Sequence, residues 1–122
     1  MELYRRLADS RTLDDVENIR EEIADRFGKL PQSATNLFDA AAVKISASIL
    51  EIDKVAFKGT TAHLLFCEDR QLRRSEIESL RKATELPLEF SVIGIVRISV
   101  DLASVSVDQQ LPTIRSILSQ VV

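Results

Sequence analysis

His63 and Cys67 are the only histidine and the only cysteine of the chain, and both lie in one short apolar segment. A catalytic histidine needs a nucleophile or an orienting partner within hydrogen-bond reach. The alternation of apolar residues in this segment places His63 on the polar side of a strand, toward solvent. Glu68 and Asp69 follow Cys67, and nearby carboxylates disfavour the thiolate that a reactive cysteine needs. We therefore expect structural roles for both residues.

Motifs for other chemistry are absent from the sequence. The three glycines, at positions 28, 59 and 94, are far apart and each suits a turn, so no phosphate-binding loop is formed. One cysteine excludes an internal disulfide and argues against a cysteine-based zinc site. We expect no cofactor, no metal ion and no catalytic residue. An enzyme of unrecognised type would need a pocket that joins His63 or Cys67 to a carboxylate.

Carboxylates are concentrated in residues 12–27, where apolar residues recur at helical spacing. At about 100° per residue, one polar stripe of this helix lies away from the apolar stripe and contains Asp15, Asn18, Glu22, Asp25 and Arg26. Glu22, Asp25 and Arg26 are spaced i, i+3, i+4, so they present charges of both signs on a rigid helix. Such a cluster is either a solvated helix face or a docking surface for a partner of complementary charge.

A basic stretch offers a competing functional feature. Its cations lie between Arg70 and Lys82: Arg70, Arg73, Arg74, Arg81 and Lys82. Acidic residues are interleaved with them, no aromatic residue is available there for base stacking, and the net charge of the chain is −3. Nucleic-acid binding by this stretch remains the alternative to partner docking.

Composition is that of an ordinary globular domain. With 122 residues, 45% hydrophobic and 29% charged, we expect one domain over residues 1–122. Five phenylalanines, one tyrosine and no tryptophan predict an aliphatic core. No apolar run reaches the length of about 18 residues that a membrane span needs. No signal peptide precedes the first charged residues, so a cytoplasmic location is expected.

The helices of the first half have clear start and stop signals. Residues 2–9 form a short helix that begins without a capping residue, as in a piece of a longer protein. Thr12 caps the helix 12–27, whose apolar stripe predicts that Phe27 is buried, and Gly28 suits a left-handed position after its end. Pro31 opens a helix that reaches about Leu50 and is apolar on two sides, which predicts a central position.

In the second half the pattern changes to alternation. Residues 52–58 and 61–67 predict a hairpin, and residues 75–83 predict a short helix. Apolar residues alternate from 88 to 102, where Gly94 indicates a bulge or a second hairpin turn. A last helix begins near Asp108, and we expect Pro112 to be tolerated only in its first turn. The fold class is therefore α+β: a helical N-terminal half followed by a small, mainly antiparallel sheet with two further helices.

Several of these segments together resemble a known family. They are Leu3-Tyr4-Arg5-Arg6-Leu7-Ala8, Asp25-Arg26-Phe27-Gly28, Leu30-Pro31, Asn36-Leu37 and Ile52-Asp53-Lys54-Val55. In this order and spacing, across roughly residues 3 to 66, they resemble the C-terminal domain of bacterial transcription-repair coupling factors. After Cys67 only the general pattern of helix, strands and terminal helix matches.

The resemblance implies a regulatory role. The parent protein would be a large ATP-driven DNA translocase that releases stalled RNA polymerase and recruits UvrA for nucleotide excision repair. This domain would pack on the UvrB-like N-terminal module of the same polypeptide and mask its UvrA-binding surface until stalled polymerase is engaged. The family's contact surface maps onto Glu22, Asp25 and Arg26. We expect a monomeric, non-catalytic fragment with no membrane partner.

Overall fold

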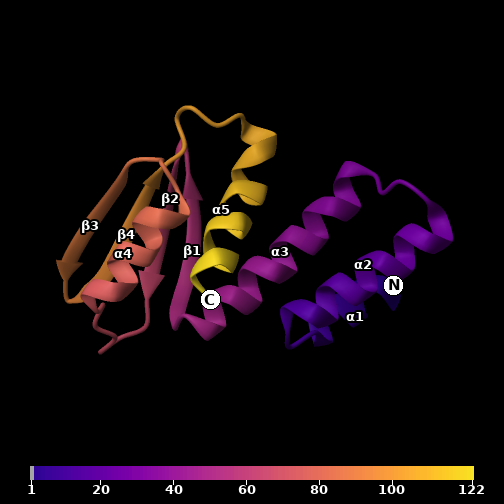
Figure 1. The fold of residues 1–122 in the computed structure, drawn as a ribbon, viewed down its shortest axis with the longest axis horizontal. Helices are drawn as coiled ribbons and strands as arrows, with labels where there is room; N and C mark the ends of the chain where they lie inside the picture. Colours follow the sequence, from indigo (N-terminus) through magenta and orange to yellow (C-terminus); the bar gives the residue numbers. More distant parts are fainter. Residues whose placement is uncertain (1) are drawn as a thin grey trace.

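The computed structural model describes residues 2–122 and divides into a helical part and a sheet part (Figure 1). Its elements are α1 (Glu2–Asp9), α2 (Leu13–Phe27), α3 (Gln32–Ile49), β1 (Ile52–Lys58), β2 (Thr61–Phe66), α4 (Arg74–Ala83), β3 (Leu88–Ile93), β4 (Ile95–Asp101) and α5 (Val107–Val121). This order confirms the predicted α+β fold, with helices first and an antiparallel sheet after them.

Local signals define both ends of α2. The Oγ1 of Thr12 accepts a hydrogen bond from the N–H of Asp15 at 3.1 Å, and the Asp15 carboxylate accepts one from the N–H of Thr12 at 3.2 Å. This reciprocal pair satisfies two N–H groups that would otherwise lack partners at the start of a helix. At the other end, Gly28 has φ 78° and ψ −147°. The predicted positive φ is confirmed, but the ψ value lies outside the left-handed helical region, in a region that is nearly confined to glycine.

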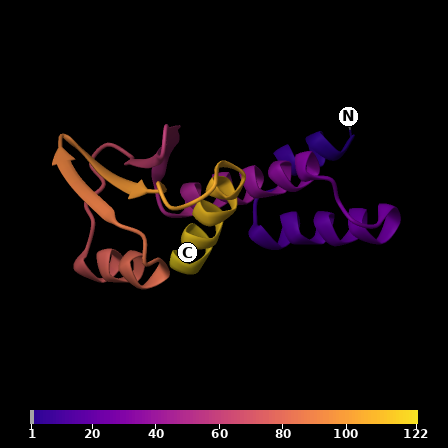
Figure 2. The ribbon, with the colours of Figure 1, turned by 90° about the horizontal axis from the view of Figure 1, so that it is seen from above.

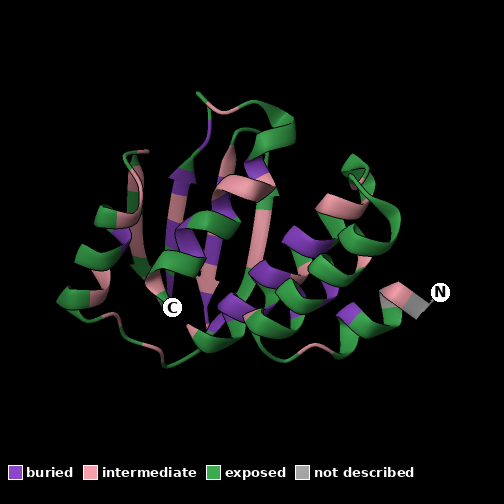
Figure 3. Cartoon of the chain, turned by 45° about the vertical axis from the view of Figure 1, so that its right-hand side comes forward, coloured by how far each residue is buried: buried purple, intermediate pink, exposed green. Residues whose placement is uncertain are grey.

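α3 lies at the centre of the molecule, as its two apolar sides predict (Figure 3). Phe38 and Ile45 join a cluster with buried residues of α1 and α2. Val43 and Ala47 join a second cluster with the sheet, α4 and α5. One helix therefore contributes to two hydrophobic cores.

The four strands form one antiparallel sheet in the order β1-β2-β4-β3. α4 and α5 lie in a second layer, against one face of the sheet (Figure 2). Side chains of β2 and β4 that face this layer, such as Leu64, Ile98 and Val100, are fully buried. Gly94 lies between the paired residues Ile93 and Ile95, so it forms the turn of a second hairpin. Of the two alternatives for Gly94, the hairpin turn is the correct one.

Pro112 departs from the prediction. α5 begins at Val107, so Pro112 lies in the second turn of the helix and not in the first. The expectation that Pro112 is tolerated only in the first turn is wrong. Pro112 has no N–H to donate to the carbonyl group of Asp108, four positions earlier. Asp108 is exposed, so water can hydrate this carbonyl group instead. The rest of α5 is anchored in the core by Ile114, Ile117 and Leu118, which are buried.

Candidate partner-binding surface

The five predicted residues all lie on α2 and are all exposed. Val16 and Ile19 of the same helix are buried. The side chains of Asn18, Asp25 and Arg26 form no hydrogen bond or ion pair within residues 2–122 as described. These three side chains therefore keep their full hydrogen-bonding capacity for a partner.

Glu22 differs from these residues because it is already paired. Arg6 of α1 donates a hydrogen bond from a guanidinium nitrogen to Oε2 of Glu22. This hydrogen bond, with the positive charges of Arg6 and then Arg26, lowers the pKa of Glu22 below its ordinary value. The pair links α1 to α2, so a partner that contacts Glu22 meets a carboxylate held in place.

Asp15 has a local structural task. Its Oδ2 accepts hydrogen bonds from the backbone N–H groups of Arg11, at 3.1 Å, and Thr12, at 3.2 Å. These two bonds lower the pKa of Asp15. Asp15 and Asn18 also line a hollow of about 360 Å³ beside Arg6 at the end of α1. The structure thus separates Asp15 and Asn18 from Asp25 and Arg26, which lie toward the other end of α2.

Phe27 contradicts its predicted burial, because its side chain is 70% exposed. The chain turns at Gly28 directly after it, and Leu30 packs instead against the hydrophobic cluster that α1, α2 and α3 share. Phe27 therefore stands in solvent at the C-terminal end of α2, directly after Asp25 and Arg26 in the sequence but on another side of the helix. Helical periodicity missed it because periodicity gives the direction of a side chain, not whether a neighbour covers it. We call Glu22, Asp25, Arg26 and Phe27 the α2 surface.

The basic stretch is largely engaged within the domain. Arg70 pairs with Glu76 and lies 3.4 Å from a carboxylate oxygen of Glu51. The guanidinium of Arg81 lies 5.6 Å from the centre of the Phe90 ring. The hydrogen bond from Arg70 is the largest cause of a lowered pKa at Glu76. Nothing in this arrangement favours the nucleic-acid alternative.

His63 and Cys67 do not meet in one site. The Nδ1 of His63 is 2.8 Å from Oγ of Ser99, which ties β2 to β4, and His63 is half-buried and not fully turned to solvent. Cys67 lines a cavity together with Glu51 and Asp53, and His63 is not among the residues that line it. Within residues 2–122 as described, no group of three or more histidine, cysteine or acidic side chains is placed to hold a metal ion. None of the helices described there is long and apolar enough to cross a membrane.

Comparison with known proteins identifies relatives for this chain. The family model of the TRCF domain matches residues 1–77. The transcription-repair-coupling factor of Escherichia coli (strain K12) is 38% identical over 55 residues, which are 45% of this chain and 5% of that protein. The same factor from Helicobacter pylori (strain J99) is 32% identical over 71 residues, which are 58% of this chain and 7% of that protein. The chain thus spans a small part of the length of these relatives.

A solved structure shows the same fold over nearly the whole chain. It is the crystal structure of the C-terminal domain of a transcription-repair coupling factor, with a TM-score of 0.84 and 18% sequence identity. The match covers 98% of this chain and 76% of that one, so it includes β3, β4 and α5, which lie beyond the family match. Because the family model matches more than half of its residues, the chain belongs to the TRCF domain family, found at the C-terminus of transcription-repair coupling factors.

Proposed function

We propose that this domain is the autoinhibitory module of a transcription-repair coupling factor. Its α2 surface packs on the UvrB-like module of the same polypeptide and masks the UvrA-binding surface there. Engagement of stalled RNA polymerase on DNA releases it. The domain itself performs no catalysis, and the parent acts in the cytoplasm, where its polymerase and DNA partners are found.

One observation carries this proposal. Asp25, Arg26 and Phe27 are consecutive, exposed and located at the end of a well-capped helix, and the two charged side chains form no hydrogen bond or ion pair within the described residues. Exposed charges add little to the stability of a domain, about 0–1 kcal/mol per pair. Arginine is one of the residue types that most often act as interface hot spots.

The energetics suit a contact that can be released. Removing one partner of a charge pair that is buried in an interface costs about 2–5 kcal/mol of binding free energy. A contact that depends on a few such pairs can hold the module closed and still open when a competing ligand binds the masked surface. Glu22 adds rigidity, since its pair with Arg6 fixes α1 against the same helix.

Calorimetric titration tests the proposal directly. The 122-residue chain is titrated into the separately expressed UvrB-like module of the same parent, as wild type and as the Asp25→Ala/Arg26→Ala/Phe27→Ala variant. The matched control is Arg74→Ala/Glu78→Ala, which removes an exposed pair from α4. We expect the α2 variant to lose binding with an unchanged melting temperature, and the control to bind as wild type does.

A second experiment uses the full-length parent, in case the separated modules bind too weakly to be measured. In the parent, the linker between them supplies an effective concentration of the order of millimolar. In the full-length parent, the α2 variant should bind UvrA more tightly than wild type. Equal UvrA binding by the two full-length proteins would disprove the autoinhibitory role. Undiminished binding of the α2 variant in the first experiment would disprove the surface.

A further inference from the structure

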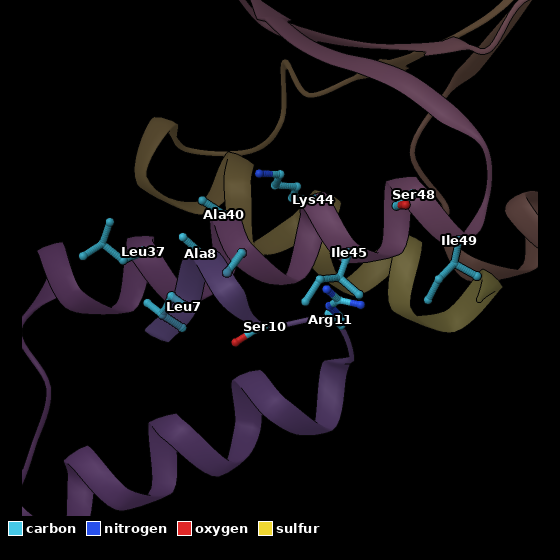
Figure 4. A pocket seen from close by; sticks show the side chains of 11 residues that line it. Leu7, Ala8, Ser10, Arg11, Leu37, Ala40, Lys44, Ile45, Ser48 and Ile49 are labelled. Carbon is cyan, nitrogen blue, oxygen red and sulfur yellow. The ribbon is translucent and has the colours of Figure 1, made fainter. Parts of the chain in front are cut away.

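A groove runs along the side of α3 that faces α1. Exposed side chains follow this side of the helix at helical spacing: Leu37, Ala40, Lys44, Ser48 and Ile49. Leu7 and Ala8 of α1 line the other side, together with Ser10 and Arg11 of the following loop, which lie beside Ile45 (Figure 4). The cavity between them has a volume of about 430 Å³. We call it the α1–α3 groove.

The groove is long enough for a helix, and small and apolar side chains line it. From Leu37 to Ile49 it follows α3 for about 18 Å, at about 1.5 Å per residue, or roughly three helical turns. Ala8, Ala40 and Ser48 are small, so the backbone of an occupant can approach closely. Ile49 is 55% exposed and Leu37 is 36% exposed, so apolar surface remains uncovered at both ends.

The charges of the groove have a single sign. Among the residues whose side chains the structure describes, Arg11 and Lys44 are the only ionisable ones that line it, in a chain whose net charge is −3. Within the part of the chain that the structure describes, neither side chain forms an ion pair. Two unpaired cations beside an apolar floor are complementary to a partner that has both apolar and acidic residues.

We propose that the α1–α3 groove binds an amphipathic helix of a partner protein, with apolar residues at i, i+3 or i+4, and i+7 and carboxylates on the flanks. The apolar face would lie on Leu37, Ala40 and Ile49, and the carboxylates would pair with Arg11 and Lys44. A helix satisfies its own backbone groups. An extended strand would leave backbone groups unpaired there, because both walls are helices with no free edge.

This site is separate from the α2 surface. None of the groove residues belongs to the α2 surface, so substitutions in one leave the residues of the other unchanged. The groove proposal therefore stands or falls independently of the autoinhibitory role.

Fluorescence anisotropy with designed peptides tests the groove. The probe is a fluorescein-labelled, 16-residue helical peptide with a leucine stripe and flanking glutamates, and its twin has lysines at the glutamate positions. We expect saturable binding of the acidic peptide to the 122-residue chain and at least about tenfold weaker binding of the basic twin, because charge complementarity sets the preference.

Variants of the chain locate the binding. Arg11→Glu/Lys44→Glu should weaken the acidic peptide by about tenfold or more and strengthen the basic twin. Ile49→Gln, at an exposed position, should weaken both peptides. The matched control Lys58→Glu/Lys82→Glu makes the same change of charge at exposed positions away from the groove, and should leave binding unchanged.

Four outcomes would overturn the proposal. The acidic peptide could fail to show saturable binding, or both peptides could bind equally well. The groove variant and the control could lose the same amount of affinity for the peptide, or the chain could associate with itself. In the last case, sedimentation would show a dimer of the chain that Arg11→Glu/Lys44→Glu dissociates, which would make a second copy the occupant.

Discussion

The Nε of Arg115 on α5 lies 2.7 Å from Oδ1 of Asp39 on α3. Asp39 is buried, whereas the Arg115 side chain is 45% exposed. Burial raises the pKa of Asp39, and the attraction of Arg115 and then Arg20 only partly opposes this effect. The other carboxylate oxygen, Oδ2, is buried without a hydrogen-bond partner. The buried charge of Asp39 is therefore compensated mainly by Arg115.

Arg115→Ala should destabilise the domain by about 1–3 kcal/mol, because it leaves a buried charge unpaired. Adding Asp39→Asn should recover most of this loss, since no charge then remains to be compensated. Urea denaturation of the two single variants and the double variant measures the coupling. A loss that persists in the double variant would assign the effect to packing of the Arg115 side chain instead.

The same pair has a defined pH dependence. A raised pKa in the folded state means that protonation of Asp39 favours folding. The stabilisation that protonated Asp39 gives is fully present below the pKa of Asp39 in the unfolded state. It is lost as the pH rises through the pKa of Asp39 in the folded state. The cost of Arg115→Ala should therefore shrink as the pH falls through the Asp39 pKa. A cost that stays constant across an acid pH series of denaturation curves would contradict the assignment.

The stability contribution of Glu76 should depend on pH in the opposite direction to that of Asp39, and Glu76→Gln tests this. Arg70 lowers the pKa of Glu76 in the folded state. The ionised pair therefore stabilises the fold above the pKa of Glu76 in the unfolded state, and this stabilisation is lost as the pH falls through the pKa of Glu76 in the folded state. At neutral pH we expect a cost of about 1.5–3 kcal/mol for this partly buried charged hydrogen bond. The cost should vanish in acid. Glu78→Gln, in an exposed pair with Arg74, is the control and should change little at any pH.

Gly28→Ala should cost about 1–3 kcal/mol, since the backbone of Gly28 lies in a region that L-residues avoid. No atom would meet the new Cβ within 4 Å, so the cost comes from the backbone and not from a clash. Thermal unfolding beside the control Lys29→Ala measures it. A melting temperature equal to that of wild type would show that the turn relaxes without strain.

How much could be predicted from the sequence depends on how local each signal is. Thr12 with Asp15 and the turn at Gly59 are specified by neighbouring residues, and the structure contains them as expected. The two-sided pattern of α3 is confirmed only in part, because Leu37, Ala40 and Ile49 of its apolar stripes are exposed. Whether Gly94 forms a bulge or a turn depends on which strand pairs with residues 88–93. That pairing is a tertiary property.

The features of the candidate site also divide into those that the local sequence specifies and those that depend on tertiary packing. The exposed stripe of α2 follows from helical periodicity alone, so its residues were predicted correctly as a surface. The pair of Glu22 with Arg6 and the exposure of Phe27 depend on how α1 and Leu30 pack, and no local pattern contains that information. Binding by this stripe stays a prediction.

The position of α3 between two cores has a consequence for hydrogen exchange. If the α1–α2 pair opens as one unit, α3 still packs on the sheet through Val43 and Ala47. Amides of α1 and α2 should therefore exchange together and early, while those at the C-terminal end of α3 exchange with the sheet. A partner bound across α2 would slow the first group only.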